Sequence, residues 1–426
     1  MPVAVSLSDV VTGSARWCVE PADLRFALDG FPDCSVDAVV CDPPYELGFM
    51  GRSWDRSGIA FDPDTWARCL RVAKPGAHLL AFGGTRTWHR IAVAIEDAGW
   101  VLRDSIAWMY GSGFPKSLDV SKAIDAAAGA EAAAKWSGYG TALKPAFEPI
   151  IVARKPLDGT VAANVLKWGT GGINVDGCRI DAPDGKYARF NHSDKTSPGH
   201  VFGPGRMHAE PDGKGRWPAN VILDESQAAA LDAMSGERTS GRLGVGHGSS
   251  NSFGVGNTDK KPRAIDREYG NDSGGASRFY FCPKASTAER EMGLDHLPPR
   301  TAGELTGRKD GSAGLTPRAG AGRASQGRRN THPTVKPVEL MRWLVRLVTP
   351  PGGLVLDPFT GSGTTGIAAM LEGDGRRFVG VDLDPYHVEI ARARIAHVIG
   401  GGYQRAVETE PAPVPTQVSL FGGQHG

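Results

Sequence analysis

Alternating strand and helix patterns occur at both ends of this chain of 426 residues and are absent from its middle. Residues 14–155 and 331–398 alternate short apolar strand patterns with helical ones. From 156 to 330, Gly, Pro, Ser, Asn and Asp dominate. The two ends together supply about seven strands, and neither alone completes a sheet. The sequence therefore predicts an α/β fold, a doubly wound sheet built from both ends of the chain, with a long irregular insert.

The predicted boundaries follow from these patterns. We expect one half of the sheet domain in residues 1–155, the insert in 156–330, the second half in 331–400 and a disordered tail in 401–426. The predicted strands are 15–19, 36–41, 77–83, 100–110, 146–156, 354–359 and 376–384. The predicted helices are 21–28, beginning at Pro21, then 65–76, ending at Pro75-Gly76, and 85–99, 338–353, 363–373 and 385–399.

Charge and cysteine content exclude few functions, but they indicate where the protein works and which partners it can bind. The formal net charge is +1, so a nucleic acid would have to bind a local basic patch. The six cysteines include no Cys-x-x-Cys pair, which argues against a zinc site and a disulfide framework. No signal-peptide pattern or membrane-length apolar run is present. We therefore expect a soluble, cytoplasmic protein without a metal site or a membrane partner.

A glycine-rich turn between a strand and a helix, "LVLDPFTGSGTTG" at 354–366, indicates a bound cofactor. Gly361 and Gly363 let the backbone approach a ligand, and the helix start offers free N–H groups. Asp382 ends the next strand, where an acid can hold ribose hydroxyls. Asp357, just before the turn, would repel a pyrophosphate and suit an ammonium group. S-adenosylmethionine, with a ribose, a sulfonium and an amino group, fits better than a dinucleotide.

The stretch "VVCDPPY" at 39–45 stops a buried strand with an acid, two prolines and an aromatic ring. The carboxyl ends of strands line the ligand crevice in such folds, which places Asp42 there. The side chain of Asp42 and the carbonyl of Pro43 can accept two hydrogen bonds from one amino group. Pro44 stiffens the turn, and Tyr45 can stack on a planar ring. This set fits the exocyclic amino group of a flipped base better than it fits a plain rigid turn.

With these patterns, the chain resembles the amino-group DNA methyltransferases that use S-adenosylmethionine. The resemblance rests on "DPPY" at 42–45, "HPTVKP" at 332–337, "DPFTGSGTTG" at 357–366 and "GVDLD" at 380–384. The catalytic motif precedes the cofactor motif, which resembles the order in the beta group of this N6-adenine/N4-cytosine family. The resemblance implies a Rossmann-like methyltransferase sheet with a catalytic first half and a cofactor-binding second half, and with the target-recognition region in the insert.

The family also implies a role for each matching residue. The cofactor turn would be formed by Phe359, Gly361 and Gly363. Asp357 would contact the methionine amino group, and Asp382 would contact the ribose. Thr334 and Lys336 would lie near the methionine carboxylate. Where relatives commonly have a Gly-Asp pair, this chain has "ARWCVE" at 15–20, so we assign no contact to the adenine ring there.

The resemblance implies direct methyl transfer to a base that has left the duplex. Asp42 and the Pro43 carbonyl would hold its amino group toward the sulfonium methyl, through positioning and electrostatics. No cysteine nucleophile is needed, and Cys41 is interpreted as a core residue. Relatives with Asp at the first position mostly act on adenine N6, whereas Ser is commoner for cytosine N4. We expect site-specific adenine N6 methylation, with cytosine N4 as the alternative.

The insert is where contacts with double-stranded DNA are expected. Candidates are "RWPANVILD" at 216–224, "SRFYFCPKAS" at 277–286 and the basic loop 311–330, although this loop is equally typical of a solvated linker. We favour packing within the insert for the aromatic residues Trp217, Phe279 and Tyr280. Lys116, in "GSGFPKS" at 111–117, is predicted either to contact phosphate or to lie in a plain surface loop.

Alternatives and further partners stay open at this point. "QVSLF" at 417–421 resembles the short motif by which bacterial proteins bind the replication sliding clamp, through Gln417, Leu420 and Phe421. An RNA or protein amino-group methyltransferase is disfavoured by the motif order. A catalytically inactive DNA-binding protein is disfavoured because all three site aspartates are intact. A homodimer and a partner enzyme for restriction-modification are not decided by the sequence.

Overall fold

The computed structural model describes residues 5–47, 53–111, 113, 117–181, 189–190, 207–208, 215–239, 273–283, 288–301 and 327–403. Its main feature is an eight-stranded sheet in the order β1-β12-β11-β2-β3-β5-β4-β8. The strands are β1 (Trp17–Pro21), β2 (Val36–Cys41), β3 (Ala73–Phe82), β4 (Val101–Met109), β5 (Phe147–Arg154), β8 (Val221–Leu223), β11 (Leu354–Asp357) and β12 (Arg377–Asp382). The prediction of one sheet built from both ends of the chain is confirmed.

The strand directions place the carboxyl ends of most strands at the same end of the sheet. The first five strands in the order are mutually parallel. β5 is antiparallel to both β3 and β4, and β4 is parallel to β8. Hence β1, β12, β11, β2, β3, β4 and β8 all point the same way, and the loops after them meet at a common edge.

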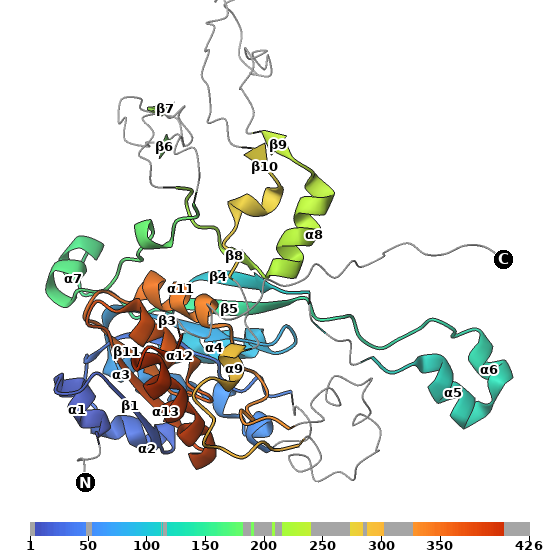
Figure 1. The fold of residues 1–426 in the computed structure, drawn as a ribbon, viewed down its shortest axis with the longest axis horizontal. Helices are drawn as coiled ribbons and strands as arrows, with labels where there is room; N and C mark the ends of the chain where they lie inside the picture. Colours follow the sequence, from blue (N-terminus) through green and yellow to red (C-terminus); the bar gives the residue numbers. More distant parts are fainter. Residues whose placement is uncertain are drawn as a thin grey trace, which may run out of the picture.

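Helices cover both faces of the sheet (Figure 1). On β2, Val39 and Cys41 face one apolar core and Ala38 and Val40 face the other, because successive strand side chains point to opposite faces. The first core is covered by α1 (Leu7–Thr12), α2 (Leu24–Ala27), α3 (Pro63–Val72) and α4 (Trp88–Asp97). The second is covered by α11 (Val338–Val348), α12 (Thr364–Glu372) and α13 (Pro385–Ile399). The doubly wound class is thereby confirmed.

Three predicted elements are wrong in part. Pro21 ends β1, and α2 begins only at Leu24 after its N-cap Asp23. Proline can occupy β1 because this strand lies at the sheet edge, where a missing N–H costs little. The helix expected through Gly76 ends at Val72, and the chain continues directly into β3. The insert, predicted as irregular, contributes β8 as an eighth strand.

The beginning of the insert packs onto α11 and thereby joins the main core. After α7 (Val161–Trp168), the chain runs to a 3-10 turn at Asp176–Cys178. The indole Nε1 of Trp343 donates to the carbonyl of Cys178 at 3.3 Å, and the ring of Phe281 stacks on Trp343 at 5.4 Å. These residues are buried or half-buried. Two distant parts of the insert are therefore fixed to the same helix.

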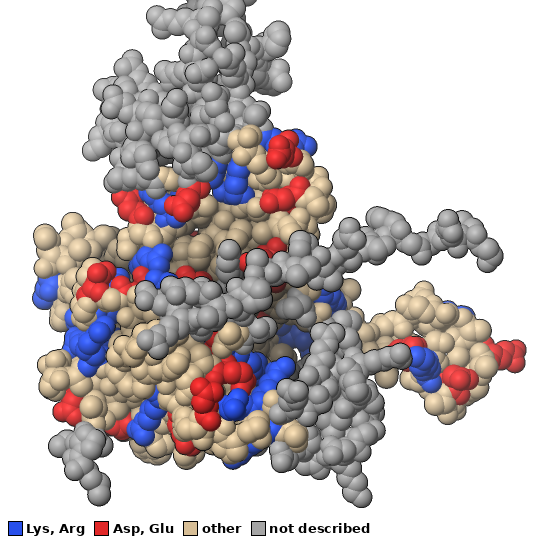
Figure 2. Space-filling view, viewed as in Figure 1, with Lys and Arg blue, Asp and Glu red and all other residues tan. Residues whose placement is uncertain are grey.

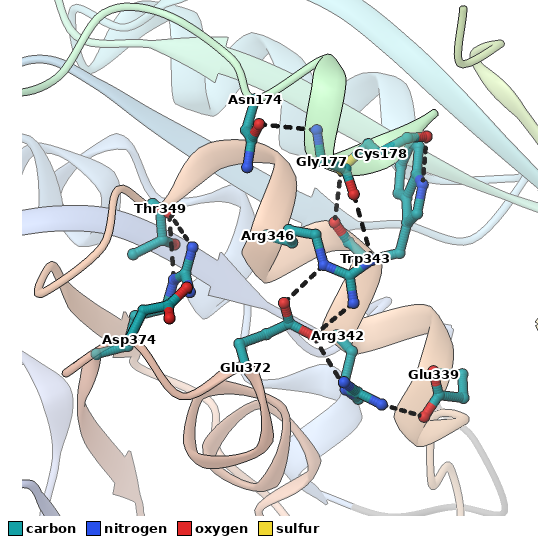
Figure 3. A network of polar contacts seen from close by, with 11 residues as sticks. Asn174, Gly177, Cys178, Glu339, Arg342, Trp343, Arg346, Thr349, Glu372 and Asp374 are labelled. Carbon is teal, nitrogen blue, oxygen red and sulfur yellow. Dashed lines mark hydrogen bonds and ion pairs between the residues drawn. The ribbon is translucent and has the colours of Figure 1, made fainter. Parts of the chain in front are cut away.

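A carboxylate between two arginines ties α12 to α11 (Figure 3). Glu372 accepts from Arg346 Nε at 2.6 Å and from Arg342 Nε at 3.0 Å. Arg342 also donates to Glu339, and Arg346 donates to the carbonyl of Gly177 in the insert. Although burial alone would raise it, the two arginines hold the pKa of Glu372 below its ordinary value. This network joins both helices to the start of the insert.

Other parts of the insert and one arm lie outside the sheet (Figure 1). The arm carries α5 (Val120–Ala128) and α6 (Ala130–Ala134), and α5 buries none of its side chains. The insert adds α8 (Glu225–Ser235), α9 (Ala288–Glu291) and two short ladders, β6 (Arg189–Phe190) with β7 (Met207–His208) and β9 (Arg238–Thr239) with β10 (Ser273–Gly274). Charges of both signs are interspersed over the visible surface (Figure 2). Among the described residues, no helix combines the length and apolarity that crossing a membrane requires.

Candidate functional site

Three carboxylates from opposite ends of the chain lie at the carboxyl edge of neighbouring strands. Asp42 follows β2, Asp357 ends β11 and Asp382 ends β12. β11 lies between the other two strands, pairing Leu356 with Val39 and Asp357 with Gly380. The structure thus brings together the catalytic and cofactor residues that the sequence predicts for one crevice.

A cavity of about 660 Å³ lies at this edge, within the usual size range of small-molecule sites. Its lining combines residues that follow β2 with residues that follow β1, β11 and β12. The lining includes Ala22 to Arg25, Asp42 to Tyr45, Leu47, Asp55, Ser57 to Ile59, Asp62, His332, Thr334, Pro358, Phe359, Asp382 to Pro385 and His387. A single cavity therefore reaches both groups of predicted site residues.

Only one of the two carboxylate oxygens of Asp42 has a hydrogen-bond partner among the described residues. Its Oδ2 accepts from Lys336 Nζ at 2.5 Å, and the side chains of Asp42 and Lys336 are 17% and 6% exposed. Its Oδ1 is buried and has no hydrogen-bond partner among the described residues. A buried carboxylate oxygen without a donor is costly, and a donor supplied by a ligand beside Asp42 would offset that cost.

Tyr45 and Glu148 complete the surroundings of this ion pair. The hydroxyl of Tyr45 donates to Glu148 Oε2 at 2.9 Å, and Lys336 Nζ lies 3.4 Å from the same oxygen. Thr87, at the start of α4, donates to the carbonyl of Tyr45 at 2.7 Å. The Lys336 ammonium also lies 4.8 Å from the centre of the Phe82 ring. Glu148 is not among the residues predicted from the sequence, since an isolated acid in an apolar strand carries no spacing signal.

The charges of this cluster oppose the effect of burial. Burial raises the pKa of Asp42, the charge of Lys336 acts in the opposite direction, and the charge of Glu148 adds to the rise. For Lys336, burial alone would lower the pKa, but the charges of Asp42 and Glu148 raise it above its ordinary value. Lys336 therefore stays protonated, and its positive charge favours the ionised form of Asp42.

The glycine turn is shaped by Asp382. The N–H of Gly361 donates to Asp382 Oδ2 at 2.8 Å, and the N–H of Asp384 donates to Oδ1 at 2.9 Å. Gly361 has φ of 52°, and an added Cβ would lie 2.6 Å from His332 Nε2. Gly363 has φ of 80°, and its added Cβ would lie 2.9 Å from Ala391 Cα. Both positions therefore require glycine, for backbone conformation and for space.

Asp357 lies beneath this turn and is only 2% exposed. It accepts from Thr365 Oγ1 at 2.5 Å and from the N–H of Phe359 at 3.0 Å. Burial raises the pKa of Asp357 to about 7, against the effect of these two hydrogen bonds. The ring of Phe359, which lines the cavity, packs 6.1 Å from Trp66 of α3. A cationic ligand group near the turn would favour the ionised form of Asp357.

Two histidines that the sequence analysis did not assign also line the cavity. The rings of His332 and His387 meet edge to face at 4.8 Å. Burial, and next the charge of His387, lower the pKa of His332 to about 3, so this ring is neutral. His387 Nδ1 lies 3.7 Å from Asp382 Oδ1, and His387 contributes to holding the pKa of Asp382 below its ordinary value. His332 also adjoins the glycine turn, because its Nε2 would lie 2.6 Å from an added Cβ at Gly361.

Thr334 and Lys336 occupy different places. Thr334 is exposed and lines the cavity, whereas Lys336 is buried behind Asp42 and is not among the lining residues. The expected contact of Lys336 with a cofactor carboxylate stays a prediction. Cys41 is buried in the sheet core, as predicted, and burial raises the pKa of its thiol well above the ordinary value.

In the insert, the packing predicted for two aromatic residues is wrong. Trp217 and Phe279 are 66% and 41% exposed and lie against arginine side chains instead of in a core. Tyr280 is half-buried. Trp217 precedes β8, the outermost strand on the side of the sheet away from β1. Lys116, most of the basic loop and the 417–421 motif lie outside the described residues.

Comparisons with known proteins give a consistent family. A family model described as DNA methylase, N6_N4_Mtase, matches residues 36–393. Type II methyltransferase M2.DpnII of Streptococcus pneumoniae is 45% identical over 64 residues, which cover 15% of this chain and 23% of that protein. Type II methyltransferase M.HindIII of Haemophilus influenzae is 30% identical over 115 residues, covering 26% of this chain and 37% of that protein. The matches thus span well under half the length of these curated relatives.

Among solved structures, the PvuII DNA methyltransferase, described as cytosine-N4-specific, is similar at 13% identity and a TM-score of 0.41. That alignment covers 93% of this chain and 94% of the other. A complex of M1.HpyAVI with SAM is similar at 15% identity and a TM-score of 0.36, over 89% of this chain and 98% of the other.

Proposed function

Since this chain belongs to the N6_N4_Mtase family of DNA methylases, we propose that it transfers a methyl group from S-adenosylmethionine to an exocyclic amino group of double-stranded DNA at a specific site. One observation carries the proposal. Asp42 lines the cavity that also reaches Phe359 of the glycine turn, and one oxygen of its carboxylate is buried without a partner among the described residues. An amino group entering that cavity supplies the missing donor.

The base end of the cavity has the groups that an amino substrate needs. Asp42 Oδ1 and the carbonyl of Pro43 each accept one N–H of a flipped base, and Pro44 keeps the two acceptors in a fixed arrangement. The ring of Tyr45 stacks on the base and is held by the hydrogen bond from its hydroxyl to Glu148. These hydrogen bonds draw the amino lone pair away from the ring, so that it is available to an electrophile.

The other end fits S-adenosylmethionine by size and by the type of its polar groups. Phe359 supplies an apolar wall, and Gly361 and Gly363 keep the turn free of side chains. We assign the ribose to Asp382, the ammonium group to the negative potential of Asp357, and the carboxylate to Thr334. The bound cofactor supplies an electrophilic methyl group on its sulfonium.

Adenine N6 is our proposed acceptor, because the first residue of the "DPPY" stretch is an aspartate. Cytosine N4 is the alternative. DNA incubated with the protein and methyl-labelled S-adenosylmethionine, digested to nucleosides and separated, tests this directly. We expect the label in N6-methyldeoxyadenosine. Label in N4-methyldeoxycytidine would contradict the choice of base but not the reaction class.

We also propose roles for the segments that the site does not contain. Residues 156–330 would recognise the target sequence, and genomic mapping of modified bases after expression would give that sequence. The 417–421 motif would bind a replication sliding clamp. A pull-down with purified clamp should succeed with the full chain and fail after residues 417–421 are removed, and equal recovery would contradict the clamp contact.

A further inference from the structure

Lys336 contacts Asp42 and Glu148 contacts Lys336, and neither Lys336 nor Glu148 is among the residues that line the cavity. Lys336 is 6% exposed, and its ammonium lies between Asp42 Oδ2 at 2.5 Å and Glu148 Oε2 at 3.4 Å. The Tyr45 hydroxyl lies 3.4 Å from the same ammonium. The rings of Tyr45 and Phe82 flank it, with centres at 5.6 and 4.8 Å. Lys336 is therefore held by contacts from four residues.

We propose that Lys336 and Glu148 are positioning residues for methyl transfer: Lys336 binds Oδ2 of Asp42 and leaves Oδ1 for the target amino group, while Glu148 fixes both Lys336 and the Tyr45 ring. This inference rests on the proposed function. It assigns Lys336 a part in substrate alignment, whereas the family resemblance predicts a contact with the cofactor carboxylate.

Lys336 fixes which oxygen of Asp42 is available to a ligand. A carboxylate at the end of a strand can rotate about its side-chain bonds, and either oxygen could then face the cavity. Lys336 removes this freedom, because it engages one oxygen and is itself too enclosed to follow a rotation. The other oxygen, Oδ1, is left buried without a described partner. Misplacement of about 1 Å at such a site can cost roughly 100-fold in rate.

Glu148 lies on β5, a strand with neighbours on both sides in the sheet. β5 pairs Glu148 with Trp108 of β4, and Ile150 with Phe82 of β3. The carboxylate therefore has a rigid base. It accepts from the Tyr45 hydroxyl at 2.9 Å, so one acid aligns both the ring that stacks on the base and the cation that aligns Asp42.

The charge of Lys336 also keeps Asp42 ionised. The charged or titratable groups that act on Asp42 are Lys336, Glu148, Tyr45, Cys41 and Asp357. Only Lys336 carries a positive charge among them. Without it, Asp42 would be a buried acid beside other acids and would take up a proton more readily. Protonation would remove an acceptor from the amino group, so activity should be lost on the acid side.

The experiment compares Lys336→Met, Lys336→Arg, Glu148→Gln and the double variant Lys336→Met/Glu148→Gln in the full chain. Lys122→Met is the matched control, because the Lys122 side chain is 85% exposed on α5. For each protein, kcat and KM for DNA are measured at saturating S-adenosylmethionine across pH 6 to 9. The dissociation constant of the cofactor is measured by calorimetry, and thermal unfolding reports on folding.

We expect Lys336→Met to lower kcat about 100-fold at neutral pH, as a misplaced reacting group would. The acid limb of its kcat profile should move to higher pH, and its cofactor affinity should stay within about threefold of the wild type, or under 1 kcal/mol. Lys336→Arg should restore part of kcat. The double variant should return the acid limb toward lower pH, because the like charge of Glu148 is also gone.

Three results would overturn the inference. One is a large loss of cofactor affinity in Lys336→Met with an unchanged kcat, which would favour a carboxylate contact. Another is an acid limb that does not move in a folded Lys336→Met protein. The third is a kcat in Lys336→Met equal to that of Lys122→Met. Failure of the wild-type protein to methylate any DNA amino group is a different outcome, since it rejects the proposed function itself.

Discussion

The N–H of Gly361 donates to Oδ2 of Asp382 at 2.8 Å, which fixes the glycine turn after β11 to the end of β12. The second oxygen of Asp382 accepts from Asp384 at the start of α13. The acid therefore determines the shape of the turn besides facing the cavity. A ligand meets a turn that is already formed, and formation of the site requires that both strands are in register.

Gly361→Ala should weaken cofactor binding. The position combines φ of 52° with an added Cβ 2.6 Å from His332, so the turn must move. We expect an approximately tenfold rise in the cofactor dissociation constant, about 1.4 kcal/mol, by calorimetry. Gly352→Ala is the matched control, because its φ is 71° but the space around it is open. Equal affinities in the two variants would contradict a site-specific effect.

Cofactor affinity should rise with pH around neutrality. Burial raises the pKa of Asp357 to about 7, and a ligand ammonium prefers its ionised form. Below that pH, binding must first remove a proton, so affinity should fall by about tenfold per pH unit. Calorimetry between pH 5.5 and 8 checks this. Asp357→Asn should bind more weakly and without this dependence, and a flat wild-type profile would contradict the assignment.

Glu372→Gln should destabilise the protein without changing the site. Glu372 is 5% exposed and neutralises Arg342 and Arg346, which are 25% and 28% exposed. Removing the charge leaves two partly buried cations, with an expected loss of about 3 kcal/mol in the free energy of unfolding. Denaturant unfolding measures it. Asp119→Asn, in an exposed pair with Lys122, should cost under about 1 kcal/mol. Similar losses in both variants would argue against a special stabilising role of Glu372 between Arg342 and Arg346.

Replacing Tyr45 should separate stacking from ring alignment. Tyr45→Ala removes the ring, and the loss of base stacking should cost about 1–3 kcal/mol, seen as a higher KM for DNA and a lower kcat. Tyr45→Phe keeps the ring but loses the 2.9 Å hydrogen bond to Glu148, so we expect a smaller loss, mainly in kcat. Steady-state kinetics on one DNA substrate decide this, and equal losses in both variants would contradict the stacking role.

Much of the fold follows from local patterns. The continuous apolar runs of β2 and β3, which are buried on both faces, and the helical apolar spacing in α4 and α11 are visible in the sequence because each such element buries one or two complete faces. Two elements could not be predicted from local patterns: the helix start expected at Pro21 is wrong, and strand β8 was not predicted. Pro21 is compatible with an edge strand as well as with a helix start, and β8 is a strand only because β4 offers an unpaired edge to three residues.

The site was predictable where function requires a local motif and not where it requires a distant contact. Asp42 directly follows a strand, and Asp357 and Asp382 each end one, so their proximity follows from the order of the strands in the sheet. The contacts of Lys336 could not be predicted in this way, because its partner Glu148 lies on a strand whose neighbours are set by the topology of the sheet. The neighbouring rings of His332 and His387 likewise arise from packing between segments far apart in the sequence.

Methyl transfer by Asp42→Ala, measured beside cofactor binding, tests the central claim most directly. Wild-type protein, labelled S-adenosylmethionine and DNA with many sequence contexts are incubated, and label in the DNA amino groups is quantified. We predict label with the wild type, at least about 1,000-fold less with Asp42→Ala, and nearly equal cofactor dissociation constants, since Asp42 acts on the base. Label on DNA that is unchanged by Asp42→Ala, or loss of cofactor binding equal to the loss of transfer, would contradict the account.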